Sequence, residues 1–267
     1  MTGSHHKDLK RENKDTEVWD REAIKTLKSK SAGWFSYYIG SSYRIATRIG
    51  LKLLGLKNKI NLLKVDLWNE GIESQRDILG QYQNHDKINL YGVDISDVVC
   101  SYAKLRLKSV NIIQGDIRNL PFKNSSFDIL LDLSTLDHVP ETQAISTLRE
   151  YERVLKKGAI LVLIYWYCSF FVKVFKVKHI IKAREKTTQY YFSTTLIKNN
   201  IKGRINIIDE YYTGILLCVP TLCFILDRLP VSIRNSILSF ILKLEFSKPS
   251  KYVFRTLGGL HVIIGKK

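Results

Sequence analysis

INLYGVDIS, at residues 88–96, shows the pattern that organises this chain. Its apolar residues form a short, almost continuous run that ends at Asp94, as in a strand covered by helices on both faces. The pattern returns in VNIIQGD (110–116) and FDILLDL (127–133), which carry Asp116 and Asp132 at their ends. After the first run, Ser96 stands at an N-cap position before a segment with helical spacing. The sequence therefore predicts strands that each end near an acid and are separated by polar or helical returns.

Strands and helices that alternate at this spacing predict an α/β fold with a doubly wound, mostly parallel sheet. In such sheets, ligands bind at the carboxyl ends of the strands, near the switch in strand order. Asp94 and Asp116 are therefore expected at the ligand edge. There an ionised carboxylate can accept hydrogen bonds from both hydroxyls of a ribose. The structural alternative for either acid is to cap the helix that follows.

Three segments together resemble the consecutive motifs of class I, Rossmann-like S-adenosylmethionine-dependent methyltransferases. They are YGVDIS (91–96), GDIRNLPFKNSSFDILLDLSTLDHV (115–139) and LREYERVLKKGAILVLIYW (148–166). The resemblance covers about residues 61–167 and, more loosely, the last strand. It implies S-adenosylmethionine as the cofactor and a seven-stranded sheet whose last strand is antiparallel.

The resemblance also assigns roles to individual residues. Asp94 would hold the ribose hydroxyls, and Ile95 would pack on the adenine. The remaining positions are Asp116 and Ile117 at the adenine amino group and ring, and Leu133 and Ser134 beside the methionine part.

The loop after the first predicted strand, 60–67, departs from the family pattern. The family places an acid and then alternating glycines here, so that the backbone can approach the methionine part closely. The chain reads DLWNEGIES: Asp66 matches the acid, but Trp68 and Glu70 stand at glycine positions. We predict a rerouted loop in which Glu70 approaches the cofactor's amino group. The alternative is that Glu70 only lies in the first turn of the next helix, where the helix dipole stabilises it.

LSTLDHVP, after the strand at 127–133, places Asp137 and His138 at the ligand edge. A histidine there could act as a general base, because its intrinsic pKa is near neutrality. It could equally be a structural loop residue, since positioning alone can supply much of the rate of methyl transfer.

The predicted domain organisation is one core with appended helical segments. Residues 1–58 are expected to form a tail, disordered over 1–15, and a helical cover. Residues 59–168 are the cofactor-binding core, completed by 193–210 and 255–267. The helix expected at the start of 193–210 would be capped near Ser193. Residues 169–192 and the very apolar 211–254, broken at Pro220 and Pro230, are interpreted as substrate-facing helical insertions.

The charge of this basic protein is unevenly distributed. Residues 1–64 carry 14 basic and 6 acidic side chains, residues 65–150 carry 8 and 13, and residues 151–267 carry 20 and 6. Basic flanks favour an anionic partner such as a phosphate-bearing substrate, an RNA or an acidic membrane surface, or simply reflect a lysine-rich composition. Four cysteines without a CxxC pair indicate free thiols and no metal site. The expected location is the cytoplasm, with peripheral membrane contact as a variant, because no signal peptide or spanning segment is visible.

Three functions from different classes fit these observations. The leading hypothesis is a methyltransferase that acts on a small or lipid-like acceptor, either neutral or anionic. The second is an RNA methyltransferase, suggested by the basic flanks, although no RNA-binding module is recognisable. The third is a non-catalytic relative that binds a nucleoside, suggested by the missing glycines.

Overall fold

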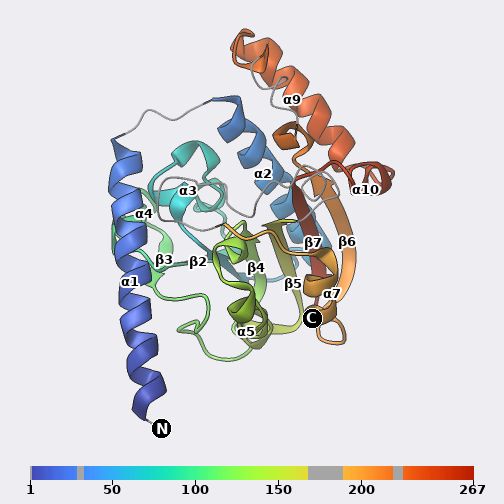
Figure 1. The fold of residues 1–267 in the computed structure, drawn as a ribbon. Coiled ribbons are helices and arrows are strands. Elements are labelled where there is room, and N and C mark those ends of the chain that lie inside the picture. Colours follow the sequence, from blue (N-terminus) through green and yellow to red (C-terminus); the bar gives the residue numbers. More distant parts are fainter. Residues whose placement is uncertain (1, 29–32, 168–188, 219–224) are drawn as a thin grey trace.

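The computed structural model describes residues 2–28, 33–167, 189–218 and 225–267. Its centre is a seven-stranded sheet in the order β3-β2-β1-β4-β5-β7-β6 (Figure 1). The strands are β1 (Ile60–Val65), β2 (Ile88–Asp94), β3 (Val110–Gln114), β4 (Phe127–Leu133), β5 (Leu155–Trp166), β6 (Asn206–Thr213) and β7 (Leu260–Lys266). The first five pair in parallel, and β7 runs antiparallel to both β5 and β6. The predicted fold class is confirmed.

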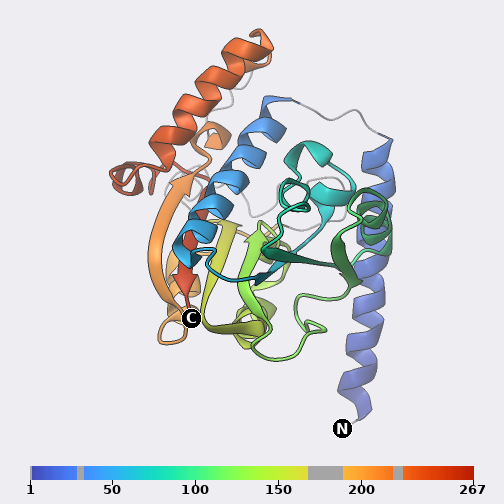
Figure 2. The same cartoon turned by 180° about the vertical axis from the view of Figure 1, so that it is seen from behind.

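Helices cover both faces of this sheet (Figures 1 and 2). They are α1 (Thr2–Leu27), α2 (Trp34–Leu54), α3 (Trp68–Gly71), α4 (Asp97–Arg106), α5 (Glu141–Val154), α7 (Thr194–Ile201), α9 (Val231–Glu245) and α10 (Ser250–Val253). Short 3-10 helices lie at Ser74–Arg76, Leu79–Gln81, Leu136–His138 and Ile215–Cys218. The predicted caps are present, since the Ser96 and Ser193 hydroxyls accept hydrogen bonds from the Val99 and Leu196 amides, each at 3.1 Å.

The two faces of the sheet build two hydrophobic clusters, because successive strand residues point to opposite sides. Leu62 and Ile129 face α2 and α4, whereas Leu63 and Leu130 face α5 and α7. Helix α2 lies very close to the sheet at Gly50, where an added Cβ would stand 2.5 Å from a methyl group of Val162. This close contact holds α2 against the sheet.

Several boundaries differ from the sequence prediction. The predicted disordered tail, 1–15, belongs to α1, and its lysines, glutamate and arginine are good helix formers. β1 ends at Val65 because Asp66 takes a positive φ of 69°, which a strand cannot continue through. β6 extends to Thr213, so the predicted insertion at 211–254 begins later than expected.

The two predicted insertions are only partly described. Most of 169–192, and the break at Pro220, lie outside the described residues. Helix α9 begins directly after Pro230, as predicted, and packs on α2 through the buried Leu238 and Leu242. No helix in the described part of the chain combines the length and apolar character needed to cross a membrane.

Candidate functional site

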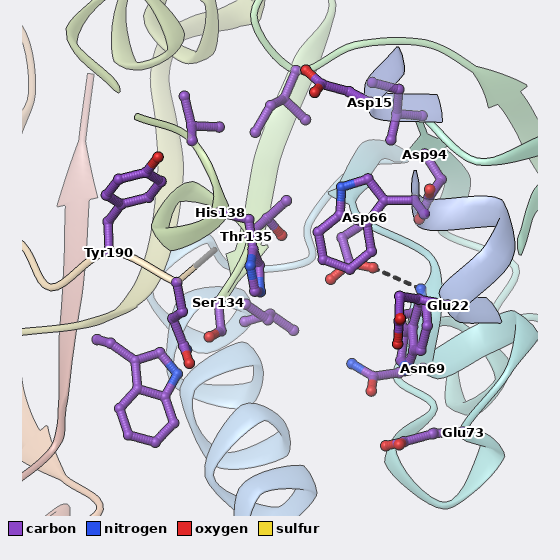
Figure 3. Close-up of a pocket in the computed structure, with 18 of the residues that line it drawn as sticks. Asp15, Glu22, Asp66, Asn69, Glu73, Asp94, Ser134, Thr135, His138 and Tyr190 are labelled. Atoms are coloured by element: carbon purple, nitrogen blue, oxygen red, sulfur yellow. Dashed lines mark hydrogen bonds between the residues drawn. The ribbon is translucent and has the colours of Figure 1, made fainter. Parts of the chain in front are cut away.

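A cavity of about 700 Å³ opens at the carboxyl ends of the parallel strands (Figure 3). The ends of β1 to β4 form its floor, and side chains from α1 and α2 form its cover. Eight of the nine predicted cofactor residues line it, and Glu70 is the ninth. The eight are Asp66, Trp68, Asp94, Ile95, Asp116, Ile117, Leu133 and Ser134. The fold therefore gathers most of the sequence prediction around one space.

Asp94 stands at the end of β2 with its carboxylate fixed by the backbone. Its Oδ2 accepts a hydrogen bond from the Leu67 amide at 2.7 Å, and its Oδ1 accepts one from the Ser96 amide at 2.8 Å. Burial raises the pKa of Asp94 to about 7, and the nearby Asp66 adds to this rise. Each carboxylate oxygen can accept a further hydrogen bond. Asp94 is therefore a rigid acceptor that faces the cavity.

Asp66 and Trp68 form the loop that replaces the glycine motif. The left-handed backbone at Asp66 is uncommon for a residue with a side chain. Its Oδ1 accepts a hydrogen bond from the Trp68 amide at 2.7 Å, the contact drawn in Figure 3. This bond holds the turn into α3, and both side chains line the cavity.

Glu70 does not line the cavity, although the prediction has it approach the cofactor's amino group. It is fully buried beneath the loop and forms an ion pair with the fully buried Lys64 at 2.9 Å. One oxygen also accepts hydrogen bonds from the Ile78 and Leu79 amides. The alternative interpretation, that Glu70 lies in the first turn of the next helix, agrees with its place in α3. The side chain is held there by Lys64 and by these two amides, in addition to the helix dipole. Sequence spacing could not reveal this, because the contacts come from β1 and from residues after α3.

Asp116 lines the cavity but is bound by an arginine. The Arg118 Nε donates to both carboxylate oxygens of Asp116, at 2.9 and 2.7 Å, and Arg118 Nη2 also contacts Oδ2. The same guanidinium reaches Asp15 of α1 at 2.9 Å. Arg118 thus neutralises Asp116 and joins the end of β3 to the covering helix.

Asp137 and His138 are separated by the structure into a buried and a cavity-facing residue. Asp137 is fully buried, does not line the cavity, and accepts hydrogen bonds from Ser134 at 3.1 Å and Gln189 at 2.9 Å. His138 lines the cavity, and its Nε2 lies 4.0 Å from Asp137 Oδ2, too far for a hydrogen bond. Asp137 therefore holds the loop, and of these two residues His138 is the one that lines the cavity.

Helix α1 closes the cavity through contacts that the sequence did not identify. Trp19 packs edge-on against His138 and Trp68, with ring centroids 4.9 and 5.9 Å apart. Asp20 accepts hydrogen bonds from the Ser96 hydroxyl at 2.5 Å and the Val98 amide at 3.2 Å. The apolar stripe on residues 18–27 indicated a covering helix, but no local signal gave these partners.

The cavity is acidic although the whole protein is basic. Its described lining contains carboxylates from Asp15, Glu22, Asp66, Glu73, Asp94 and Asp116, and guanidinium groups from Arg76 and Arg118. Figure 3 shows Asp66, Asp94, Glu22 and Glu73 on one side of the space, opposite Ser134, His138 and Tyr190. This excess of acid favours a cationic ligand and disfavours a polyanion.

The other part of the lining is aromatic and apolar: Phe35, Ile39, Tyr43, Trp166, Tyr190 and Leu260. Burial raises the pKa of Tyr43, so its hydroxyl stays protonated. None of the described residues in 214–254 lines the cavity. The prediction that this insertion faces the substrate is therefore not met by its described part, because α9 packs on the outer side of α2.

Residues 71–163 match the family described as a methyltransferase domain. This match spans the strands β2 to β4, whose ends carry Asp94, Asp116 and Ser134. The chain carries a class I, Rossmann-like methyltransferase domain. Its cofactor is S-adenosylmethionine.

Curated relatives match part of this chain. A ubiquinone/menaquinone biosynthesis C-methyltransferase of Campylobacter jejuni is 32% identical over 101 residues, which is 38% of this chain and 38% of that protein. A demethylmenaquinone methyltransferase of Staphylococcus saprophyticus is 35% identical over 74 residues, 27% of this chain and 31% of that protein. The matches thus span about a third of these relatives' length.

Solved structures share the fold over a larger part of the chain. A SAM-dependent methyltransferase of Methanosarcina mazei has a TM-score of 0.54 at 16% identity, covering 79% of this chain and 93% of that one. A geranyl diphosphate C-methyltransferase of Streptomyces coelicolor has a TM-score of 0.53 at 12% identity, covering 83% and 75%. At these identities the likeness is one of fold.

The residues present in the domain fit this cofactor. S-adenosylmethionine carries a sulfonium and an ammonium group, and the acidic side of the cavity suits these cations. Asp94 presents a backbone-fixed carboxylate to the space, which suits a diol that donates two hydrogen bonds. The volume of about 700 Å³ lies in the range of small-molecule sites, so the lost glycines have not closed the cavity.

Proposed function

We propose that this protein transfers a methyl group from S-adenosylmethionine to a small, lipid-like acceptor that binds at the aromatic end of the cavity. The observation that carries the proposal is that one cavity combines an excess of carboxylates with aromatic and apolar side chains, of which Tyr190 lies opposite Asp66 and Asp94 in Figure 3. The carboxylates suit the cationic cofactor, and the aromatic side chains suit a flat or isoprenoid acceptor. The names of the relatives, which refer to quinones, support the same acceptor class.

The residue roles in this proposal follow the strand ends. Asp94 would hold the ribose hydroxyls, with Ile95 and Ile117 against the adenine ring. Asp116 would lie at the adenine amino group and could bond it on giving up one of the four hydrogen bonds that its carboxylate accepts from Arg118. Asp66, Trp68, Leu133 and Ser134 would border the methionine part.

When bound, S-adenosylmethionine supplies an electrophilic methyl group on a sulfonium. The side chains then need only align the acceptor and exclude water, which the cover of α1 and α2 favours. His138 is the imidazole that faces the cavity, and it would accept the proton that the acceptor loses. Trp19 fixes the plane of this ring by packing edge-on against it.

A neutral acceptor is favoured over RNA or another polyanion. Six carboxylates and two guanidinium groups line the described cavity, so a phosphate backbone would meet a repulsive field there. The basic residues of the chain lie mainly outside this acidic region. A cytoplasmic protein that reaches its lipid-like acceptor by peripheral membrane contact fits this distribution.

The test is transfer of an isotope-labelled methyl group from S-adenosylmethionine to an extractable lipid. Suitable probes are demethylmenaquinone in its reduced form and 2-methyl-6-phytyl-1,4-hydroquinone, which the relatives' names suggest. We expect label in the organic phase with at least one probe, and a pH profile that His138→Asn alters. Cofactor binding without label in any lipid, or label in added RNA instead, would overturn the proposal.

A further inference from the structure

Helix α9 has an apolar stripe on its outer side as well as on its inner side. Inwards, Leu238 and Leu242 are buried against α2. Outwards, four large apolar side chains recur with helical spacing and are well exposed: Ile233 (51%), Ile237 (37%), Phe240 (62%) and Leu244 (44%). Such a row lies along one line of a helix surface. A helix that stays apolar on its outer side indicates a partner that the described part of the chain does not supply.

The exposed apolar surface continues beyond α9. Ile225 and Val231 lie just before it or in its first turn, and Tyr252 and Val253 lie in α10, all of them more than half exposed. Figures 1 and 2 show α9 and α10 together at one edge of the molecule, on the outer side of α2 and β6. We call this surface, formed by the exposed apolar residues of 225–253, the α9 face.

Cations border the α9 face. Lys243, Lys248 and Arg255 are exposed next to it, and the exposed acid in the same segment is Asp227. Two copies of this chain joined through the face would bring these cations together, which opposes a homodimer. Apolar side chains flanked by lysine and arginine are instead the pattern of a helix that lies in the interface of an anionic bilayer.

Helix α9 is firmly joined to the body of the protein. Its buried Glu245 accepts hydrogen bonds from the Tyr38 hydroxyl at 2.5 Å and the Thr213 hydroxyl at 2.6 Å. Ser239 and Tyr37 also lie within hydrogen-bond distance, at 3.0 Å. Helix α9 is therefore bonded to α2, which also lines the cavity, so a contact that holds α9 also holds the domain that contains the cavity.

We propose that the α9 face docks the protein on an anionic lipid surface, with α9 parallel to the membrane plane. Its 15 residues make it about 22 Å long, enough for a helix lying in the interface. Docking there sets α2 between the lipid and the cavity. Docking itself does not depend on the proposed function. Only the reason for docking, access to a lipid-like acceptor, rests on that function.

The test is flotation of the full chain with vesicles of phosphatidylcholine, with and without phosphatidylglycerol. We expect binding to the anionic vesicles that weakens with salt, and at most weak binding to the neutral ones. The double variant Ile233→Asn/Phe240→Asn should lower the partition coefficient at least tenfold. The matched control is Leu105→Asn on α4, because Leu105 is 66% exposed and lies outside the α9 face.

Titration with S-adenosylmethionine and a thermal melt accompany each variant, so that a folding defect is recognised. The charge variant Lys243→Glu/Lys248→Glu, which changes two exposed side chains, provides a second test and should also reduce binding. Unchanged flotation of both variants, or no flotation of the wild type, would overturn the docking proposal. A dimer in light scattering that the Ile233→Asn/Phe240→Asn variant dissociates would overturn it in favour of self-association. Because flotation needs no methyl transfer, these results are independent of the proposed activity.

Discussion

The carboxylate of Asp94, at the end of β2, accepts a hydrogen bond from the Leu67 amide at 2.7 Å. Leu67 follows β1, so this one contact joins the two strand ends on either side of the cofactor region. It also positions the loop that carries Trp68 without the glycines that the family uses there. Asp94 therefore has a structural role and a binding role together.

Replacing Asp94 by alanine should weaken S-adenosylmethionine binding by about 1.5 to 3 kcal/mol, the range for hydrogen bonds to a charged group. It should also lower the free energy of unfolding by about 1 to 3 kcal/mol, because the Leu67 and Ser96 amides lose their acceptor. Calorimetric titration and denaturant unfolding measure the two effects. Asp97→Ala is the control, since Asp97 is an exposed acid near the start of α4 that does not line the cavity. Equal affinities of the two variants would refute the diol assignment.

Cofactor affinity should rise with pH. Burial raises the pKa of Asp94 to about 7, and the hydroxyl donors of a ribose need the ionised carboxylate. We expect the association constant to increase up to about tenfold per pH unit below pH 7 and to level off above it. Titrations at a series of pH values check this, and Asp94→Ala should give a flatter profile.

The stability effect of the same group has the opposite sign. Because the folded state raises the pKa of Asp94 above its ordinary value, the folded protein holds this proton more tightly than the unfolded chain. Its contribution to stability should therefore be full below about pH 4 and be lost as the pH rises to about 7. Asp132, whose pKa burial also raises to about 7, adds a slope of the same sign. Unfolding curves across this range would contradict the assignment if stability did not change or rose with pH.

Glu70 should matter for stability and little for cofactor binding. Glu70→Ala leaves Lys64 as a buried charge without its partner, which costs about 3 to 5 kcal/mol. The folded fraction should keep its affinity for S-adenosylmethionine. Lys64→Met/Glu70→Leu should recover part of the loss, since an apolar pair can replace a buried ion pair. The comparison is Glu73→Ala, which removes a nearby acid that does line the cavity. A large loss of affinity in stable Glu70→Ala protein would restore the original cofactor assignment.

Trp19→Ala should loosen the cover of the cavity. The substitution removes two edge-on aromatic contacts, to Trp68 and His138, each of which contributes about 0.5 to 1.5 kcal/mol beyond burial. We expect faster amide exchange in α1 and weaker cofactor binding. The matched control is Ile24→Ala, because Ile24 is 44% exposed on the same helix. If both variants exchange at the wild-type rate, the Trp19 contacts do not hold α1 in place.

The sequence by itself determined the core of this protein. Apolar runs ending at Asp94 and at Gly115-Asp116 predicted the parallel strands, and Ser96 and Ser193 predicted helix starts, because such signals depend only on neighbouring residues. The strand-end position also placed Asp94 and Asp116 at the cavity, since the carboxyl ends of parallel strands share one edge of the sheet, but Asp132 at the end of β4 is buried against Tyr151.

Only the tertiary structure decided which of these side chains are available to a ligand. Glu70 and Asp137 have strand-end or loop positions much like those of Asp66 and His138, yet both are buried. Glu70 is held by Lys64 of β1 and by amides after α3, and Asp137 is held by Gln189, 52 residues further along the chain. The cover by Trp19 and the packing of α9 on α2 depend in the same way on long-range packing, whereas Arg118 binds Asp116 from only two residues along the chain. Local periodicity determines where a residue lies along a helix or strand. The group that binds its charged side chain depends on which other elements pack beside it.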